Sequence, residues 1–150
     1  MLHVGDTVKA FTLPDDEGNQ LSLESLAGKK KVIYFYPKDD TPGCTTEACG
    51  FRDVYDEILA KGAVVIGISA DSSESHAKFK SKYELPFYLL ADEEKRVIKQ
   101  FGAWGEKKSY GKVYEGILRT TFVLDEHNIV LKTFPKVKPA EHAAEILALL

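Results

Sequence analysis

The sequence predicts an α/β fold in which a central mixed sheet is flanked by helices. Three observations lead to this prediction. Runs of β-branched and aromatic residues, such as Val32 to Tyr36, alternate with segments whose apolar residues recur at helical spacing. Strands that alternate with helices pair in parallel through right-handed crossovers. The last two predicted strands, Ile117 to Leu124 and Ile129 to Phe134, follow each other without a helix, which predicts one antiparallel edge.

The chain is expected to form a single domain over residues 1–150, which is long enough to bury a full core. Its net charge of −3 gives no reason to expect a nucleic acid or an anionic membrane as a partner. No apolar run is long enough to span a membrane, and the first residues do not resemble a secretory signal. Two cysteines make no disulfide scaffold. These observations favour a reducing, cytoplasmic setting, and a processed organellar form would have the same features.

The N-terminal part of the chain predicts a short hairpin, because Phe11 to Leu13 and Leu21 to Leu23 flank a turn-rich segment. Ser22 to Leu26 is expected to form one helical turn that ends at Gly28. The three lysines at positions 29 to 31 precede the first core strand. They are interpreted as a solvated start of that strand, since nothing else around them is basic.

The next predicted helix begins near Cys44 and ends at Gly62, which suits a C′ position. Its apolar residues recur at helical spacing: Ala48, Phe51, Tyr55, Ile58 and Leu59. A near-continuously apolar strand follows at Ala63 to Ile68, which is typical of a buried parallel strand. Ser72 and Ser73 are suitable N-caps for another helix.

That helix is predicted to run to Tyr83, and Phe87 to Leu90 forms the next strand. Asp92 caps a further helix. The segment from Gly102 to Gly116 is rich in glycine and aromatic residues and is predicted to be a loop. Such a loop lines a substrate entrance, docks a reductant, or folds its aromatic side chains onto the core. With a last helix from Pro139, the order of elements is that of a thioredoxin-like architecture.

Cys44 lies at the carboxyl end of the strand Val32 to Tyr36, at or just inside the start of the next helix. Asp39 to Gly43 are turn and helix-start residues, and Pro42 fits the first helical position. The start of a helix favours an anion. Because a free cysteine has a pKa of about 8.5 and is mostly thiol at pH 7, a nucleophilic Cys44 also needs a nearby cation. The alternative is a small, inert, buried cysteine.

Cys49 lies five residues beyond Cys44. Within one α-helix, the two Cα atoms would be roughly 8.6 Å apart and would point about 140° away from each other. A disulfide needs Cα atoms within about 7 Å and converging Cβ atoms. The two cysteines therefore cannot bond while the helix is intact. If they do bond, the first turns must unwind, which favours a switchable disulfide over a permanent one.

The motif around Cys44 resembles that of a known family. Pro37, Thr41 and Cys44 match the peroxiredoxin signature, and FYPKDDTPGCTTEA resembles the subgroup called bacterioferritin comigratory protein or peroxiredoxin Q. The similarity covers nearly the whole chain, including GISADSSESHAKF, LLADEEKRVIKQFG and RTTFVLD. Residues 8–11 depart from the usual Ala-Pro-Asp-Phe start, which touches no catalytic position. The resemblance implies an antioxidant, thiol-dependent peroxidase for hydrogen peroxide and organic hydroperoxides that needs no cofactor.

The resemblance also assigns roles to residues. It implies that Cys44 attacks the peroxide and becomes a sulfenic acid, and that Cys49 then forms an intramolecular disulfide with it. It places Pro37 in the site, and it implies that the Thr41 hydroxyl bonds Cys44 and the peroxide, although Thr41 also suits an N-cap. Thioredoxin or a glutaredoxin-like protein would restore the thiols. A monomer is expected, because both cysteines lie in one segment.

Arg119 stands in the apolar run Ile117 to Val123, where a charge needs a partner. It is either an edge-strand residue with a surface salt bridge or the cation that holds Cys44 as a thiolate. Peroxiredoxins have an arginine before a similar run, which favours the second interpretation. Glu47 either complements the start of the helix or, as the family pattern suggests, positions Arg119.

The sequence also bears on other possible functions. A thioredoxin-type oxidoreductase would need a C-x-x-C motif, which is absent. No metal site is expected, because the four histidines are scattered and are predicted to be surface residues: His3, His76, His127 and His142. The alternative function is a non-enzymatic redox switch or holdase on the same fold. A switch of that kind would not need Pro37, Thr41 and Arg119 together.

Overall fold

The computed structural model describes residues 1–150. Its centre is a five-stranded sheet in the order β5-β4-β3-β8-β9. The strands are β3 (Lys30–Phe35), β4 (Ala63–Ser69), β5 (Tyr88–Ala91), β8 (Thr120–Leu124) and β9 (Val130–Phe134). β3 pairs with β4 in parallel and with β8 antiparallel. The predicted mixed sheet with an antiparallel edge is therefore confirmed.

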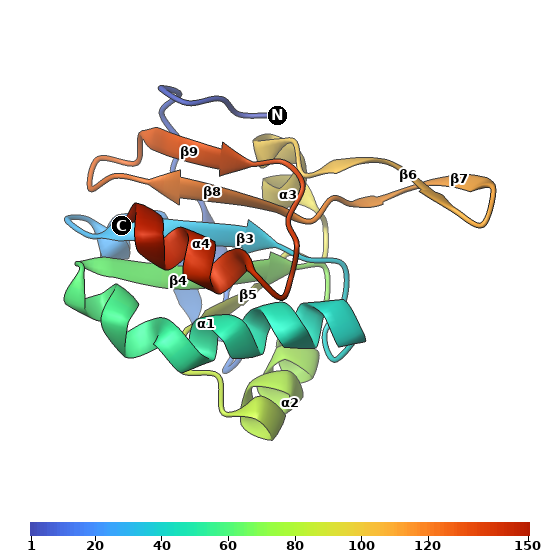
Figure 1. Cartoon of the computed structure of the whole chain (residues 1–150), viewed down its shortest axis with the longest axis horizontal. Helices are drawn as coiled ribbons and strands as arrows, with labels where there is room; N and C mark the ends of the chain where they lie inside the picture. Colours follow the sequence, from blue (N-terminus) through green and yellow to red (C-terminus); the bar gives the residue numbers. More distant parts are fainter.

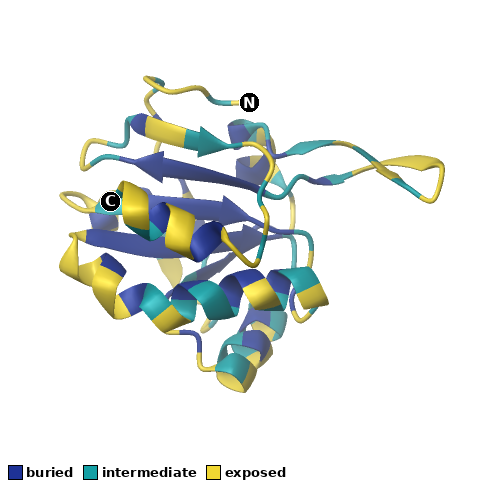
Figure 2. Cartoon of the chain, in the orientation of Figure 1, coloured by how far each residue is buried: buried dark blue, intermediate teal, exposed yellow.

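Helices cover both faces of this sheet (Figure 1). They are α1 (Pro42–Ala60), α2 (Ser73–Tyr83), α3 (Arg96–Phe101) and α4 (His142–Leu149). Side chains of β3 alternate between two core clusters: Ile33 and Phe35 pack with Phe101 of α3, whereas Val32 and Tyr34 pack with residues of α1, α2 and α4. β3 is buried on both faces as a result, and Figure 2 shows it dark blue.

The N-terminal elements match the prediction. β1 (Thr12–Pro14) and β2 (Gln20–Ser22) form a short antiparallel hairpin, followed by the 3₁₀ helix η1 (Leu23–Leu26). The Ser22 hydroxyl caps η1 by accepting from the backbone N–H of Ser25. None of the helices in the structure combines the length and the hydropathy needed to cross a lipid bilayer.

Two predicted helix starts are also confirmed. The Ser72 hydroxyl accepts from the backbone N–H of Ser75 and caps α2. The Asp92 carboxylate accepts from the backbone N–H groups of Arg96 and Ile98 at the start of α3. The last helix, in contrast, begins at His142 rather than at Pro139, because the chain first makes a turn there.

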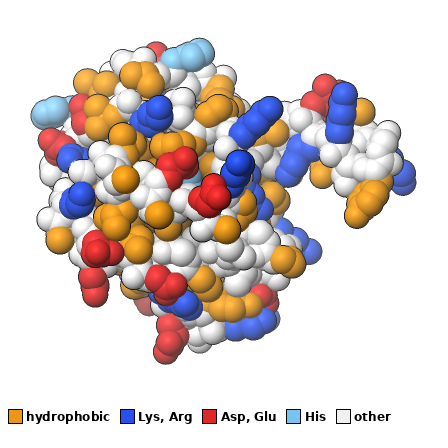
Figure 3. Space-filling model, in the orientation of Figure 1, with side chains coloured by type: hydrophobic (Ala, Val, Ile, Leu, Met, Phe, Trp, Pro, Cys, Tyr) orange, Lys and Arg blue, Asp and Glu red, His pale blue; other side chains and the backbone are white.

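The predicted loop from Gly102 to Gly116 is wrong. The structure has β6 (Trp104–Ser109) and β7 (Lys112–Ile117), which form an antiparallel hairpin that stands away from the body of the protein (Figures 1 and 3). We call it the hairpin arm. Tyr110 and Gly111 make its two-residue turn with φ values of 52° and 77°, as favoured hairpin turns require. Lysine, glutamate and glycine are weak strand formers, and they concealed these strands in the sequence.

Two further predictions need correction. The strand predicted over Ile117 to Leu124 is interrupted, because β7 ends at Ile117 and β8 begins at Thr120. The interruption frees Arg119 from the sheet. Lys31, predicted to be solvated, is fully buried in the first core strand, and its amine has no hydrogen-bond partner. Burial lowers the pKa of Lys31, although Asp125 acts to raise it.

Candidate active site

The candidate site lies between the end of β3 and the start of α1. The turn before α1 (residues 36–41) crosses the carboxyl end of the sheet, where sites form in open α/β folds. Pro42 occupies the first turn of α1, and Thr41 the N-cap position. Cys44 follows in the same turn and is only 1% exposed. The predicted placement of Cys44 at a helix start is therefore confirmed.

Arg119 joins two side chains of α1. Its Nη2 lies 3.2 Å from Sγ of Cys44, and its Nη1 donates to Oε1 of Glu47 at 2.9 Å. Gly43 lets the guanidinium come this close, because a Cβ atom there would lie 3.2 Å from Nη2 of Arg119. The structure thus brings Cys44, Glu47 and Arg119 together, although 75 positions separate Cys44 from Arg119.

Burial and charge oppose each other at this cluster. Burial raises the pKa of Glu47 to about 7, although the nearby Arg119 acts to lower it. Burial also disfavours the charge of Arg119, but Cys44 and Glu47 outweigh it and raise the pKa of the guanidinium. Oε2 of Glu47 has no hydrogen-bond partner. A cation that stays charged thus faces the thiol.

Thr41 does not make the predicted contact with Cys44. Its hydroxyl donates to the carbonyl oxygen of Lys38 at 2.8 Å, inside the turn before α1. It also makes no side-chain cap for α1. Because a carbonyl three residues back offers a local acceptor, the hydroxyl closes the turn instead.

Cys49 lies on α1 with Cys44, and both thiols are free. Cys44 is buried, whereas Cys49 is partly exposed. Just beyond Cys49, α1 packs tightly on α4, since a Cβ atom at Gly50 would lie 3.3 Å from that of Ala143. α1 is intact through both cysteines. Two cysteines at this spacing cannot form a disulfide while their helix is intact.

A hollow of about 510 Å³ adjoins Arg119 and Pro37. Its lining is partly apolar and partly basic: Met1, Pro37, Lys107, Leu118, Arg119, Pro135, Lys136 and Val137. Pro37 and Arg119 thus line the same hollow. The sequence reasoning missed Lys107 and Lys136, because Lys107 comes from the hairpin arm and Lys136 from the segment before α4. Burial lowers the pKa of Lys107, and Arg119 acts in the same direction.

The prediction that all four histidines are surface residues is wrong for two of them. His3 and His127 are exposed, but His76 and His142 are fully buried. Nε2 of His142 lies 2.8 Å from the Thr121 hydroxyl, so it joins α4 to β8, and burial lowers its pKa.

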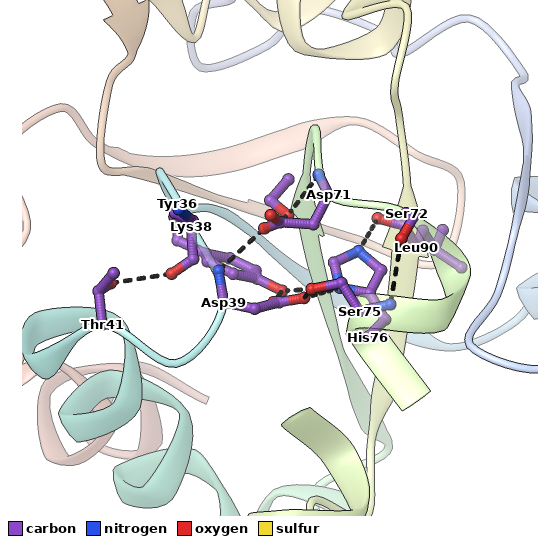
Figure 4. Close-up of polar contacts among 10 residues, drawn as sticks. Tyr36, Lys38, Asp39, Thr41, Asp71, Ser72, Ser75, His76 and Leu90 are labelled. Atoms are coloured by element: carbon purple, nitrogen blue, oxygen red, sulfur yellow. Dashed lines mark hydrogen bonds and ion pairs between the residues drawn. The ribbon is translucent and has the colours of Figure 1, made fainter. Parts of the chain in front are cut away.

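His76 lies in a polar cluster with Asp39 and Asp71 (Figure 4). Ligand atoms of these three residues lie within 4.8 Å of one another. Hydrogen bonds account for the cluster without a metal. Asp39 accepts from Tyr36 and Ser75, and Asp71 accepts from the Ser69 hydroxyl and the Asp39 backbone: Tyr36 Oη 2.6 Å, Ser75 Oγ 2.8 Å, Ser69 Oγ 2.7 Å and Asp39 N 2.9 Å.

The chain is similar in sequence and in structure to known proteins over most of its length. The AhpC/TSA family model matches residues 4–133. Peroxiredoxin Bcp of Bacillus subtilis is 46% identical over 149 residues, which cover 99% of this chain and 95% of that protein. A solved Xylella fastidiosa PrxQ mutant has a TM-score of 0.93 and 31% identity, covering 99% and 95% of the two chains. The bacterioferritin comigratory protein of Xanthomonas campestris, whose structures address alkyl peroxide reduction, has a TM-score of 0.89 and 38% identity, covering 96% of each chain.

Proposed function

Because the chain belongs to the AhpC/TSA family, as a peroxiredoxin of the Bcp and peroxiredoxin Q type, we propose that Cys44 is its peroxidatic cysteine. The protein is a thiol peroxidase of thioredoxin-like fold, an antioxidant enzyme that reduces hydroperoxides with electrons from thiols.

The observation that carries the proposal is the 3.2 Å contact between Nη2 of Arg119 and Sγ of Cys44. A fixed cation at this distance favours the thiolate over the thiol. The same guanidinium can stabilise the negative charge that develops on the peroxide oxygens during attack. The start of α1 adds a weaker favourable field, typically about 0.3–1 kcal/mol for an exposed charge.

In the proposed first step, the Cys44 thiolate attacks the distal oxygen of the peroxide. An S–O bond forms and the O–O bond breaks. The leaving oxygen takes a proton and departs as water or an alcohol, and Cys44 is left as a sulfenic acid. Pro37 shields one side of the site, and Thr41 closes the turn that presents Cys44.

In the second step, the start of α1 unwinds and Cys49 attacks the sulfur of the Cys44 sulfenic acid. A disulfide forms within the chain and water leaves. A dithiol protein of the thioredoxin or glutaredoxin type then restores both thiols by exchange. Since both cysteines lie on α1, no second chain is needed, and we propose a monomer that works in the reducing cytoplasm.

We extend the proposed substrates from hydrogen peroxide to organic hydroperoxides. The hollow beside Arg119 supports this, because Leu118, Pro135 and Val137 give it apolar walls that can receive an alkyl group. The alkyl peroxide reduction activity of the Xanthomonas campestris bacterioferritin comigratory protein provides further support.

The first experiment is a single turnover of the reduced protein with one equivalent of hydrogen peroxide, followed by intact mass and a thiol count. Loss of two hydrogens and both thiols, without a dimer, is the expected result. Gain of one oxygen with one thiol left would retain Cys44 and remove Cys49 as the resolving residue. An unchanged mass in a folded, reduced sample would refute the assignment of Cys44.

A further inference from the structure

We propose that His76 is a positioning residue for the peroxidase reaction. Its buried hydrogen bond to Asp39 holds the turn before α1 in the geometry that presents Cys44 to Arg119. This inference rests on the proposed role of Cys44. It concerns two residues that touch neither the thiol nor the guanidinium, and it gives a function to the only buried histidine near that turn.

The protons of this pair follow from its partners. Nε2 of His76 lies 2.9 Å from the carbonyl oxygen of Leu90, which can only accept, so Nε2 carries a hydrogen. Nδ1 lies 2.7 Å from Oδ2 of Asp39, so one further proton is shared between them. Asp39 also accepts from the Tyr36 and Ser75 hydroxyls, so its carboxyl group has a partner on three sides. The proton between Nδ1 and Oδ2 joins the two side chains directly.

The pair is buried and fully hydrogen-bonded. The His76 side chain is 0% exposed and that of Asp39 is 4% exposed. Solvent therefore cannot replace a lost partner, and removal of one residue leaves a buried charge or an unpaired polar group. A contact of this kind fixes a turn far more firmly than the exposed bridge from Asp40 to Lys82 on the next residue.

The pair joins the turn to a rigid part of the fold (Figure 4). His76 belongs to α2, and its Nε2–H donates to the end of β5 through Leu90. The backbone N–H of Asp39 donates to Asp71, which follows β4. The turn is thus held by its carboxylate and by its backbone to the edge of the central sheet.

The hydrogen bonds that hold the turn to α2 end at Asp40, before the start of α1 at Pro42, which must unwind. Asp39 and Asp40 bond to α2 and its flanks, whereas the Thr41 hydroxyl bonds only within the turn. Unwinding of α1 can therefore start at Pro42 while residues 36–40 stay in place. If the hydrogen bonds to α2 are lost, the start of α1 is displaced in the reduced protein, and the Cys44–Arg119 geometry is lost. A misplacement of about 1 Å can slow an enzymatic step by about 10²-fold.

A matched pair of variants tests this inference. In His76→Asn, the amide nitrogen takes the place of Nδ1 and still donates to Asp39. In His76→Gln, the amide nitrogen reaches the place of Nε2 and serves Leu90 instead. Each variant keeps one of the two short hydrogen bonds of the ring, to Asp39 or to Leu90, and removes the other. A merely structural histidine would respond similarly to both.

Two rate constants are measured by stopped flow for each variant: oxidation by hydrogen peroxide and alkylation of Cys44 by iodoacetamide. We expect His76→Gln to be at least about 10-fold slower in both reactions, and His76→Asn to stay within about threefold of wild type. Equal rates in the two variants would overturn the inference. Glu74→Gln, which removes an exposed ion pair of α2 with Lys78, is the control and should match wild type.

Asp39→Asn approaches the same bond from the other side and covers the case in which the His76 variants do not fold. It should also be at least about 10-fold slower in both reactions. Wild-type rates in a folded Asp39→Asn protein would overturn the inference. Alkylation does not involve peroxide, so it separates this inference from the assigned peroxidase role: slow oxidation of wild type itself would refute only the latter.

Discussion

The carboxylate of Glu47 is fully buried, yet only one of its two oxygens is paired, through a 2.9 Å hydrogen bond from Arg119. Burial therefore prevails over the ion pair and raises the pKa of Glu47 to about 7. The ionisation of Glu47, and with it the ion pair to Arg119, therefore changes with pH in the neutral range.

We expect Glu47 to make the stability of the protein fall as pH rises from about 4.5 to about 7. In this window the unfolded state has lost the Glu47 proton and the folded state has kept it. The unfolded state thus binds fewer protons, so the free energy of unfolding decreases with pH, by about 3 kcal/mol in total. The penalty is absent below this window and constant above it.

Glu47→Gln removes this titration. The difference in unfolding free energy, variant minus wild type, should rise across the same window and be flat on either side of it. Urea unfolding at several pH values measures this difference, in which other titrating groups cancel. A difference that does not change with pH would show that folding leaves the pKa of Glu47 at its ordinary value of 4.5.

Arg119→Lys should slow the oxidation of Cys44 by hydrogen peroxide about 100-fold. Lysine keeps the charge but cannot contact Cys44 and Glu47 with two arms at once. Competition kinetics against a second peroxidase measures the rate constant. Arg96→Lys, an exposed arginine of α3, is the matched control. Equal rates in wild type and Arg119→Lys would mean that charge alone is sufficient.

Cys49→Ser should stop the cycle after the first step. One equivalent of hydrogen peroxide should add one oxygen to the chain, and a second equivalent should convert Cys44 to the sulfinic acid. Intact mass after each addition follows both products. If the variant turned over with a dithiol reductant as fast as wild type does, Cys49 would not be the resolving residue.

Gly67→Ala should destabilise the protein by about 1–3 kcal/mol through overpacking. A Cβ atom at this position of β4 would lie 2.8 Å from the Tyr34 hydroxyl and 2.9 Å from Cδ2 of Leu89. Thermal unfolding measures the loss. Gly50→Ala is the comparison, because its Cβ would meet only that of Ala143 at 3.3 Å and should cost much less. Equal losses would show that the β4 site relaxes freely.

The core strands and helix starts could be predicted because their signals are local. The apolar run at Val32 to Tyr36 predicted a buried strand, which the structure has over Lys30–Phe35. Ser72 and Asp92 predicted two helix starts. The hairpin arm was missed for the opposite reason. Its strands bury little apolar surface, so they carry no clear alternation in the sequence.

The site was predictable only in part. Cys44 at the start of a helix follows from residues next to it in the chain. The contact of Arg119 with Cys44 depends on the interruption between β7 and β8, and the resemblance to a family was the guide to it. The bond between His76 and Asp39 joins a helix to a turn 37 positions earlier, and no sequence pattern marks such a pair.

The hairpin arm also bears on how molecules of this protein meet each other. It is a two-stranded sheet of its own, so β6 and β7 each have an edge with unpaired backbone groups. Such edges can add a strand from a neighbouring molecule. Charged side chains at Glu106, Lys108 and Lys112 oppose this, and salt screens their effect. Concentrated, high-salt solutions should therefore favour self-association through this arm.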